Sequence, residues 1–254
     1  MELYFREMGQ GAPLLILHGL FGSSDNWITI AKQLSVNYNV FLIDQRNHGQ
    51  SPHSDEWNYA VMAQDIEDFC LQHQLNEIFI AGHSMGGKTV MKLAELFPER
   101  IKKMMVIDIA PRYYPVHHHQ ILNALKSIDF NVINTRKQAE EVLQNAIEDL
   151  GTRQFLLKNI YWIAENKLAW RFNLEVITNY IEIVGEATPA EVTTICEIPV
   201  CFVRGEKSDY IKKEDEQLIA HQYPNSEIIT IANAGHWVHA EQPTAMLNAM
   251  INFF

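Results

Sequence analysis

Short apolar runs alternate with helix-like stretches along most of this chain, and this alternation limits the fold more than any other feature. Strands are expected at the apolar runs, over residues 14–17, 40–43, 78–81, 104–107, 200–203 and 228–231. Residues 3–8 could add an antiparallel edge strand. Helices are expected between the strands, over residues 27–34, 59–73, 87–96, 212–222 and 243–253. Repeated strand–helix units are typical of a mainly parallel sheet covered by helices, so the sequence predicts an α/β fold.

The alternation stops between about residues 111 and 190, where the sequence looks helical throughout. An apolar stripe with helical spacing runs along part of this segment, at Ala139, Val142, Leu143, Ala146, Ile147 and Leu150. Thr135, with Gln138 three residues later, is typical of the capping box that begins a helix. We therefore predict an α/β core built from residues 1–110 and 191–254, with a helical cap inserted at 111–190.

Composition limits the classes of partner. The formal net charge of −11 has the wrong sign to neutralise phosphates, so no nucleic-acid partner is expected. No stretch approaches 18 uncharged apolar residues, and the N-terminal segment lacks the apolar run of a signal peptide. Cys70, Cys196 and Cys201 lack C-x-x-C spacing, which fits reduced thiols. We expect a cytoplasmic protein, away from membranes, that acts on small molecules as a monomer or a small homo-oligomer.

The segment Gly82-His83-Ser84-Met85-Gly86 has the pattern G-x-S-x-G. By chance the bare pattern occurs in roughly one chain of this length in ten, so its context between an apolar strand and a helix carries the interpretation. This context is typical of a nucleophile elbow, a sharp turn that exposes the serine hydroxyl. The alternative, a Gly-rich turn that binds a dinucleotide, is weakened because G-x-G-x-x-G is absent from the first strand–helix turn. Ser84 is therefore the predicted nucleophile.

Two other loops also follow predicted strands. The loop His18-Gly19-Leu20 could help to bind an oxyanion, and the N–H groups of Leu20 and Met85 are the expected donors. His236, in the glycine-containing loop after the last strand, is the predicted general base, because a pKa near 6.5 lets histidine take and return a proton. His239 is the competing base, and we expect it to support the loop instead.

The acid that would orient His236 has two candidates. Asp108 ends an apolar strand, 24 residues after Ser84. Asp209 follows strand 200–203, where many hydrolases carry the pattern G-x-x-D, but Ser208 takes the usual position of the acid here and Asp209 comes one residue late. Both carboxylates could reach the histidine, and the one that does not is expected to cap a loop.

Several segments together resemble the α/β-hydrolase esterases of the bacterial YbfF type: GHSMGGK, HGLFGSSDNW, DQRNHGQS, IDIAP, WRFN and GHWVHAE. The resemblance spans nearly the whole chain. It implies the α/β-hydrolase fold, with a mainly parallel sheet and an inserted helical cap. It also implies esterase or acyl-CoA thioesterase activity on modest acyl chains, no cofactor, and Asp108 rather than Asp209 as the acid. Asn47, which stands where most of the superfamily has glycine, agrees with this branch.

Other residues have functional interpretations that we rank below structural ones. His117–His119 resemble metal ligands, but consecutive helical residues do not face one ion, so we expect a solvated cap surface and no metal. Lys88 and Arg112 could meet an anionic substrate, although exposed helix surface is favoured for both. A loop-bracing network is expected from Asp44, Arg46 and His48. Bulky residues that could line an acyl pocket, or belong to the core, are Phe21, Tyr113, Tyr114, Trp162 and Trp237.

The function expected from these features is a serine hydrolase that cleaves short- to medium-chain acyl esters or acyl-CoA thioesters through an acyl-enzyme. A C–C bond hydrolase, a perhydrolase and a hydrolase-fold binding module or receptor are the alternatives. Dehalogenases and epoxide hydrolases of this fold are disfavoured because they use aspartate where this chain has Ser84.

Overall fold

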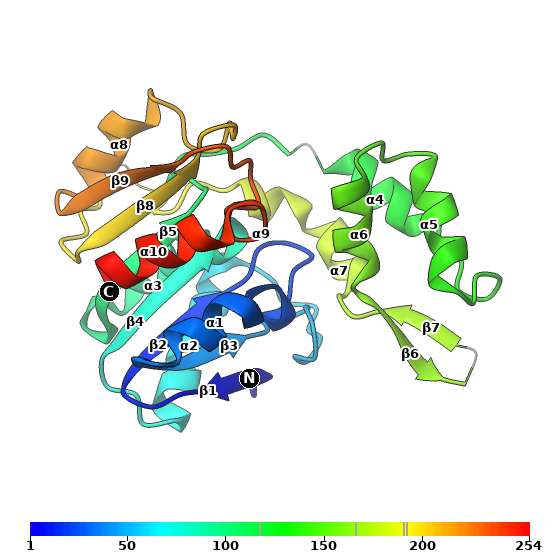
Figure 1. Ribbon diagram of the computed structural model, residues 1–254, viewed down its shortest axis with the longest axis horizontal. Helices are drawn as coiled ribbons and strands as arrows, with labels where there is room; N and C mark the ends of the chain where they lie inside the picture. The colour runs from blue at the N-terminus through cyan, green and yellow to red at the C-terminus, as the bar shows by residue number, and fades with distance from the viewer. Residues whose placement is uncertain (117, 166, 190, 192) are drawn as a thin grey trace.

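A twisted, seven-stranded sheet forms the centre of the protein (Figure 1). The computed structural model describes residues 1–116, 118–165, 167–189, 191 and 193–254. The spatial order of the strands is β1-β3-β2-β4-β5-β8-β9, and every neighbouring pair is parallel except β1–β3. The strands are β1 Phe5–Met8, β2 Ala12–Leu17, β3 Tyr38–Ile43, β4 Ile78–His83, β5 Ile101–Ile107, β8 Val200–Gly205 and β9 Ser226–Ile231. All the predicted strands are present, including the antiparallel edge strand.

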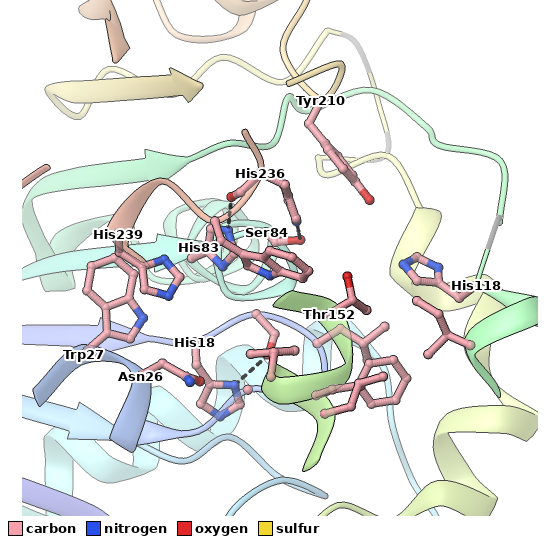
Figure 2. A pocket seen from close by; sticks show the side chains of 18 residues that line it. His18, Asn26, Trp27, His83, Ser84, His118, Thr152, Tyr210, His236 and His239 are labelled. Atoms are coloured by element: carbon pink, nitrogen blue, oxygen red, sulfur yellow. Dashed lines mark hydrogen bonds between the residues drawn. The ribbon is translucent and has the colours of Figure 1, made fainter. Parts of the chain in front are cut away.

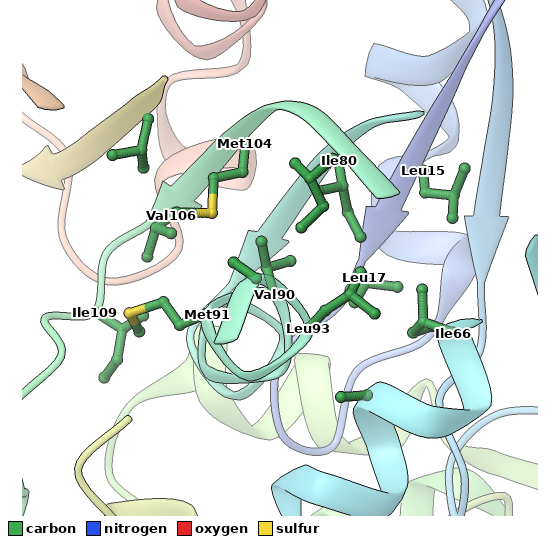
Figure 3. Close-up of a cluster of buried hydrophobic side chains, with 14 of the residues drawn as sticks. Leu15, Leu17, Ile66, Ile80, Val90, Met91, Leu93, Met104, Val106 and Ile109 are labelled. Atoms are coloured by element: carbon green, nitrogen blue, oxygen red, sulfur yellow. The ribbon is translucent and has the colours of Figure 1, made fainter. Parts of the chain in front are cut away.

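Helices cover both faces of this sheet. They are α1 Ile28–Leu34, α2 Tyr59–Gln72, α3 Met85–Leu96, α8 Asp215–Gln222, α9 Val238–Glu241 and α10 Pro243–Phe253. Leu15, Leu17 and Ile80 point to the face covered by α2 and α3 (Figure 3). Leu14 and Ile16 point to the opposite face, where α1 and α10 pack. Burial of both faces explains why these strands are continuous apolar runs rather than alternating polar and apolar residues.

The segment between β5 and β8 lies beside the sheet, on the right in Figure 1. We call this segment, residues 111–189, the cap. Its elements are α4 His119–Lys126, α5 Arg136–Gln144, α6 Leu150–Leu157, β6 Ile160–Ala164, β7 Lys167–Trp170 and α7 Leu174–Asn179, followed by the 3₁₀ helix Ile181–Gly185. The predicted capping box is present, because Thr135 Oγ1 accepts from Gln138 N at 3.2 Å and the Gln138 side chain accepts from Thr135 N. None of the helices in the described residues is long and apolar enough to cross a membrane.

Two expectations for the cap were wrong. The cap is not helical throughout, because β6 and β7 pair as an antiparallel hairpin. Its first strand, Ile160–Ala164, is rich in β-branched and aromatic residues, which favour strands. The apolar stripe also does not form one helix: α5 ends at Gln144, and Asp149 begins α6 by accepting from Thr152 N at 2.6 Å. Leu150, the last residue of the stripe, is 50% exposed at the start of that second helix.

Lys88 joins the cap to the core, which corrects the expectation that it lies on an exposed helix surface. The side chain is fully buried in α3. Its Nζ donates to the carbonyl oxygens of Pro111, Arg112 and Glu186, at 3.1, 2.7 and 2.8 Å. Those carbonyls belong to the two chain segments through which the cap leaves and re-enters the core. Burial lowers the pKa of Lys88 well below its usual value, and the positive charge of Arg112 lowers it further.

Replacing the Lys88 ammonium group should lower the free energy of unfolding of the protein. In Lys88→Met the methionine fills a similar volume, but the carbonyls of Arg112 and Glu186 lose their donor, at a cost of about 1–3 kcal/mol for each buried group. We expect the free energy of unfolding in urea to fall by about 2 kcal/mol or more. Lys92→Met, on the same helix, removes only a partly exposed ion pair with Glu95 and should change stability by less than about 1 kcal/mol. Equal stabilities of the two variants would show that Lys88 does not hold the cap.

Candidate active site

Ser84 occupies the sharp turn between β4, which ends at His83, and α3, which begins at Met85. Its backbone has φ 53° and ψ −116°, a conformation that costs energy in a residue other than glycine. Two hydrogen bonds hold the turn: Ser84 N donates to Ile107 O at 2.9 Å, and Lys88 N donates to Ser84 O at 3.1 Å. The serine lines a cavity of about 140 Å³ between the core and the cap.

Close backbone contacts explain both glycines of the G-x-S-x-G pattern. A Cβ atom on Gly82 would lie 2.2 Å from Gly86 O, and one on Gly86 would lie 2.6 Å from His18 O. Both are shorter than real contacts, and the obstructing atoms are backbone atoms that cannot rotate away. The turn therefore forms only with glycine at these two positions, which brings α3 directly against the loop that follows β2.

The structure brings Ser84, His236 and Asp108 together at the carboxyl edge of the sheet. Figure 2 shows Ser84 and His236, joined by a hydrogen bond. His236 lies in the loop after β9, and its Nε2 is 3.1 Å from Ser84 Oγ. Its Nδ1 is 2.7 Å from Asp108 Oδ2. A carboxylate only accepts hydrogen bonds at neutral pH, so Nδ1 carries the proton and Nε2 is left to accept from the serine hydroxyl. This is the geometry that a histidine needs to remove the serine proton.

Asp108, not Asp209, contacts the histidine. Asp108 follows β5 and is fully buried, and its Oδ1 accepts from Gly205 N at 2.9 Å. Ser208 Oγ, in the position where G-x-x-D would place the acid, donates a short hydrogen bond to Asp108 Oδ2. The Asp209 side chain is 94% exposed and lies 3.6 Å from Lys212 Nζ. The serine at position 208 therefore supports a carboxylate that comes from the neighbouring strand.

Burial keeps His18 and His83, two other histidines of the cavity, neutral. His18 Nε2 accepts from Gln45 N at 3.0 Å, so Nδ1 carries the proton and donates to Gly19 O at 2.8 Å. Desolvation lowers the pKa of His18 to about 4. His83 Nε2 donates to His236 O at 2.8 Å, which ties the loop of His236 to β4, and desolvation lowers the pKa of His83 well below its usual value.

His239 does not contact Ser84. Its ring stacks on Trp27 with a centroid separation of 4.4 Å, and desolvation lowers its pKa to about 3. His239 packs at the start of α9 and lines the cavity, which agrees with the expectation that it supports the loop. Of the two candidate bases, only His236 lies within hydrogen-bonding distance of the serine hydroxyl.

Leu20 and Met85, the expected oxyanion donors, both line a second, smaller cavity of about 20 Å³ beside Ser84. Because α3 begins at Met85, the N–H group of this residue has no acceptor within the helix. Hydrogen bonds of the Gln45 side chain fix the loop of Leu20. Gln45 Nε2 donates to His18 O at 2.7 Å, and Thr89 Oγ1 donates to Gln45 Oε1 at 2.8 Å. The two residues are thus fixed on one side of the serine.

Comparison with known proteins identifies the family. The model of the alpha/beta hydrolase fold family matches residues 12–155, which is more than half of the chain. The chain belongs to the α/β-hydrolase family. Esterase YbfF of Escherichia coli is 39% identical over 94% of this chain and 91% of that protein. The sn-1-specific diacylglycerol lipase ABHD11 of Danio rerio is 36% identical over 98% of this chain and 80% of that protein.

A solved structure supports the same assignment. A marine microorganism esterase superposes with a TM-score of 0.96 and is 41% identical, covering 100% of this chain and 99% of that one. The predicted α/β-hydrolase fold and the predicted resemblance to YbfF-type esterases are therefore confirmed. Like these relatives, the protein is a hydrolase with the mainly parallel sheet of the family.

The expected loop-bracing network of this hydrolase is confirmed. Asp44 accepts from Ser24 N at 2.6 Å and from Gln50 N at 2.8 Å. The Arg46 guanidinium donates to both oxygens of Asp65, at 2.6 and 2.9 Å. His48 is buried, with Nδ1 3.0 Å from Arg46 O. These side chains hold the loop after β3 beneath the cap and do not line the cavity at Ser84.

The aromatic residues divide into two groups. Phe21 and Trp237 line the larger cavity, and Tyr114 lines the smaller one. Tyr113 and Trp162 are each 54% exposed and line neither, so the expectation that they form an acyl pocket was wrong. Trp162 lies on the β6–β7 hairpin, which the sequence did not reveal, and this hairpin turns the side chain towards solvent.

Several residues that line the cavities were not expected there from the sequence. His118 lines both cavities, which corrects its assignment to solvated cap surface, whereas His117 lies outside the described residues. Tyr210 stacks on the His236 ring at 4.0 Å, and Phe155 packs against Trp237 at 5.4 Å. No local pattern marks these residues, because the chain path alone brings them to the serine. Within the described residues, no cluster of three or more His, Cys, Asp or Glu could hold a metal ion.

The geometry predicts opposite outcomes for the two candidate acids. Asp108→Asn keeps the shape of the side chain but removes the charge that fixes the proton on His236 Nδ1, so hydrolysis of an ester should slow by up to about 10⁴-fold in kcat. Asp209→Asn alters an exposed side chain and should retain kcat within about twofold. Both constants are measured on 4-nitrophenyl acetate, with circular dichroism to verify folding. The reverse ranking would assign the role of acid to Asp209.

Proposed function

We propose that the protein is a serine hydrolase that cleaves acyl esters through a covalent acyl-enzyme formed on Ser84. The observation that carries this proposal is the continuous chain of hydrogen bonds from Ser84 Oγ through His236 to Asp108, at the base of a cavity. Esterase and lipase relatives that cover most of the chain support the same chemistry.

Two steps follow from the arrangement. In the first step Ser84 Oγ attacks the acyl carbonyl carbon while His236 Nε2 takes the hydroxyl proton, and the N–H groups of Leu20 and Met85 bind the oxyanion. The tetrahedral intermediate collapses as His236 returns that proton to the departing oxygen. In the second step His236 removes a proton from water as the water oxygen attacks the acyl-enzyme. His236 then returns this proton to Ser84 Oγ as the carboxylic acid leaves. Asp108 stabilises the imidazolium that forms in each step.

The two cavities beside Ser84 support a placement for each half of the ester. A leaving group must contact His236, because this histidine protonates it, and His236 lines the larger cavity but not the smaller one. Met85, an oxyanion donor in this proposal, lines only the smaller cavity. The acyl chain therefore occupies the smaller cavity, whose 20 Å³ suits a short chain. Medium-length chains would require the cap to move.

Thioesters fit the same mechanism. A thiolate is a better leaving group than an alkoxide, so we include short acyl thioesters, among them acyl-CoA thioesters, in the proposed substrates. Perhydrolysis would replace water by peroxide in the second step, and C–C cleavage would place a carbanion at the leaving-group position. A pure binding module has no need for three groups aligned by hydrogen bonds as Ser84, His236 and Asp108 are.

The first test is removal of the nucleophile and the base. Ser84→Ala and His236→Ala should each reduce kcat for 4-nitrophenyl acetate by about 10³-fold or more, and the double variant should be little worse, because residues that act as one unit are not additive. The wild-type protein should also react with a fluorophosphonate probe, whereas Ser84→Ala should not. A Ser84→Ala variant that kept more than a tenth of the wild-type rate would exclude the serine mechanism.

The second test concerns chain length. Val184 lines the smaller cavity, so Val184→Ala should admit about one more methylene group and raise kcat/KM for that longer ester by about tenfold. Trp162→Ala is the control, because Trp162 is exposed on the hairpin and should leave the chain-length profile unchanged. The profile is measured on 4-nitrophenyl esters from two to eight carbons. A shift in the control but not in Val184→Ala would place the acyl chain elsewhere.

A further inference from the structure

A second, larger depression lies beside the cavity of Ser84. It has a volume of about 470 Å³ and runs between the cap helices α5 and α6 and the core loop at residues 21–26. Phe21, Asn26 and Phe155 line both this depression and the Ser84 cavity, so the two lie next to each other. We call it the cationic groove, for the residues Arg136, Lys137, Lys158 and Arg171 that line it.

The charge in this groove is unusual for the protein. The chain as a whole has a net charge of −11, yet the groove gathers four cations and two acids, Asp25 and Glu140. Asp25 is already paired with Arg6 at 2.6 Å. In the described part of the chain, none of the four cations lies within 4.0 Å of a carboxylate. The groove is therefore a site of uncompensated positive charge in an acidic protein.

Contacts with a carbonyl oxygen and an aromatic ring orient the two arginine side chains without neutralising their positive charge. Arg136 Nη2 donates to Ile160 O at 2.8 Å, which fixes the side chain through one of its five N–H groups. The Arg171 guanidinium lies 4.7 Å from the centre of the Tyr161 ring. A planar guanidinium that is already oriented matches the oxygens of a phosphate with little further loss of side-chain entropy. Lys137 and Lys158 are exposed, and their positive charges add long-range electrostatic attraction for an anion.

The groove joins the cavity on the side where the leaving group is expected. His236 lines the cavity that shares Phe21, Asn26 and Phe155 with the groove, and it is absent from the small cavity that suits the acyl chain. A substrate placed with its carbonyl carbon at Ser84 would then extend its leaving group past Phe155 and into the groove. An uncharged leaving group would gain nothing from four cations, whereas a phosphate group would gain charge-assisted hydrogen bonds.

We propose that the cationic groove binds a phosphate group carried on the leaving-group side of a small acyl substrate. This inference rests on the proposed serine hydrolase function and narrows its substrates to phosphate-bearing alcohols or thiols. The phosphate contributes to recognition from outside the reacting centre, so its loss raises KM and leaves the chemistry at Ser84 intact.

The test compares substrates that differ only in phosphate. S-acetyl-4′-phosphopantetheine and S-acetylpantetheine share one thioester, and 1-acetylglycerol 3-phosphate and 1-acetylglycerol share one ester. In the wild-type protein, kcat/KM should be at least about tenfold higher for the phosphate-bearing member of one pair, and added salt should reduce the difference. A preference in the first pair assigns the phosphate to a phosphopantetheine thiol, and a preference in the second pair assigns it to a glycerophosphate.

Two groove variants and one control complete the experiment. Arg136→Gln and the double variant Lys137→Gln/Lys158→Gln should each reduce the preference severalfold, through KM, while kcat/KM for the phosphate-free member stays within twofold. Lys137 and Lys158 are exposed, so the double variant tests the groove even if Arg136→Gln fails to fold. Lys32→Gln/Lys102→Gln changes the net charge equally at exposed sites of the core and should keep the full preference.

The inference is overturned if the wild-type protein shows no preference in either pair, or if both groove variants retain it. Failure of the proposed function gives a different result. In that case 4-nitrophenyl acetate, which carries no phosphate, is also not hydrolysed, or Ser84→Ala hydrolyses it as fast as the wild-type protein.

Discussion

The register of three parallel strands is the constraint on which the rest of the structure depends. Strands β4, β5 and β8 lie side by side, and each ends at the same edge of the sheet. Ser84 N donates to the last carbonyl of β5, and Asp108 N donates to Val203 O in β8. Both residues have positive φ, at 53° and 51°, so the chain turns sharply as soon as each strand ends. A slip of one residue in either pairing would separate the serine from the carboxylate.

Much of the fold could be predicted from the sequence, because its signals are local. Apolar runs, the two glycines around Ser84 and the helix after it are consecutive in the chain. The expectations that were wrong concern contacts between residues that are distant in the chain. Lys88 was expected on the exposed surface of its helix. It is a buried donor to three carbonyls only because residues 111 and 186, which are distant in the chain, both contact α3. The β6–β7 hairpin and the cavity-lining His118 likewise depend on contacts between distant segments.

The electrostatics of the cavity follow from the burial of its histidines. His18, His83 and His239 surround His236, and a positive charge on any of them would oppose the proton that His236 takes from serine. Desolvation lowers the pKa of all three, so they stay neutral near pH 7 and serve as hydrogen-bonding and stacking groups. The buried Asp108 carboxylate, in contrast, contacts His236 directly and favours the imidazolium.

The contacts of Lys88 have an evolutionary consequence. The inserted segment leaves and re-enters the core beside one ammonium group, so its two junctions are neighbours in space although about 75 residues separate them in the chain. An insertion whose two ends are neighbours in space can lengthen, shorten or be exchanged without changing the order or pairing of the strands in the sheet. Ancestral hydrolases could thus acquire new specificities by replacing this module, while the elbow beneath it stayed unchanged.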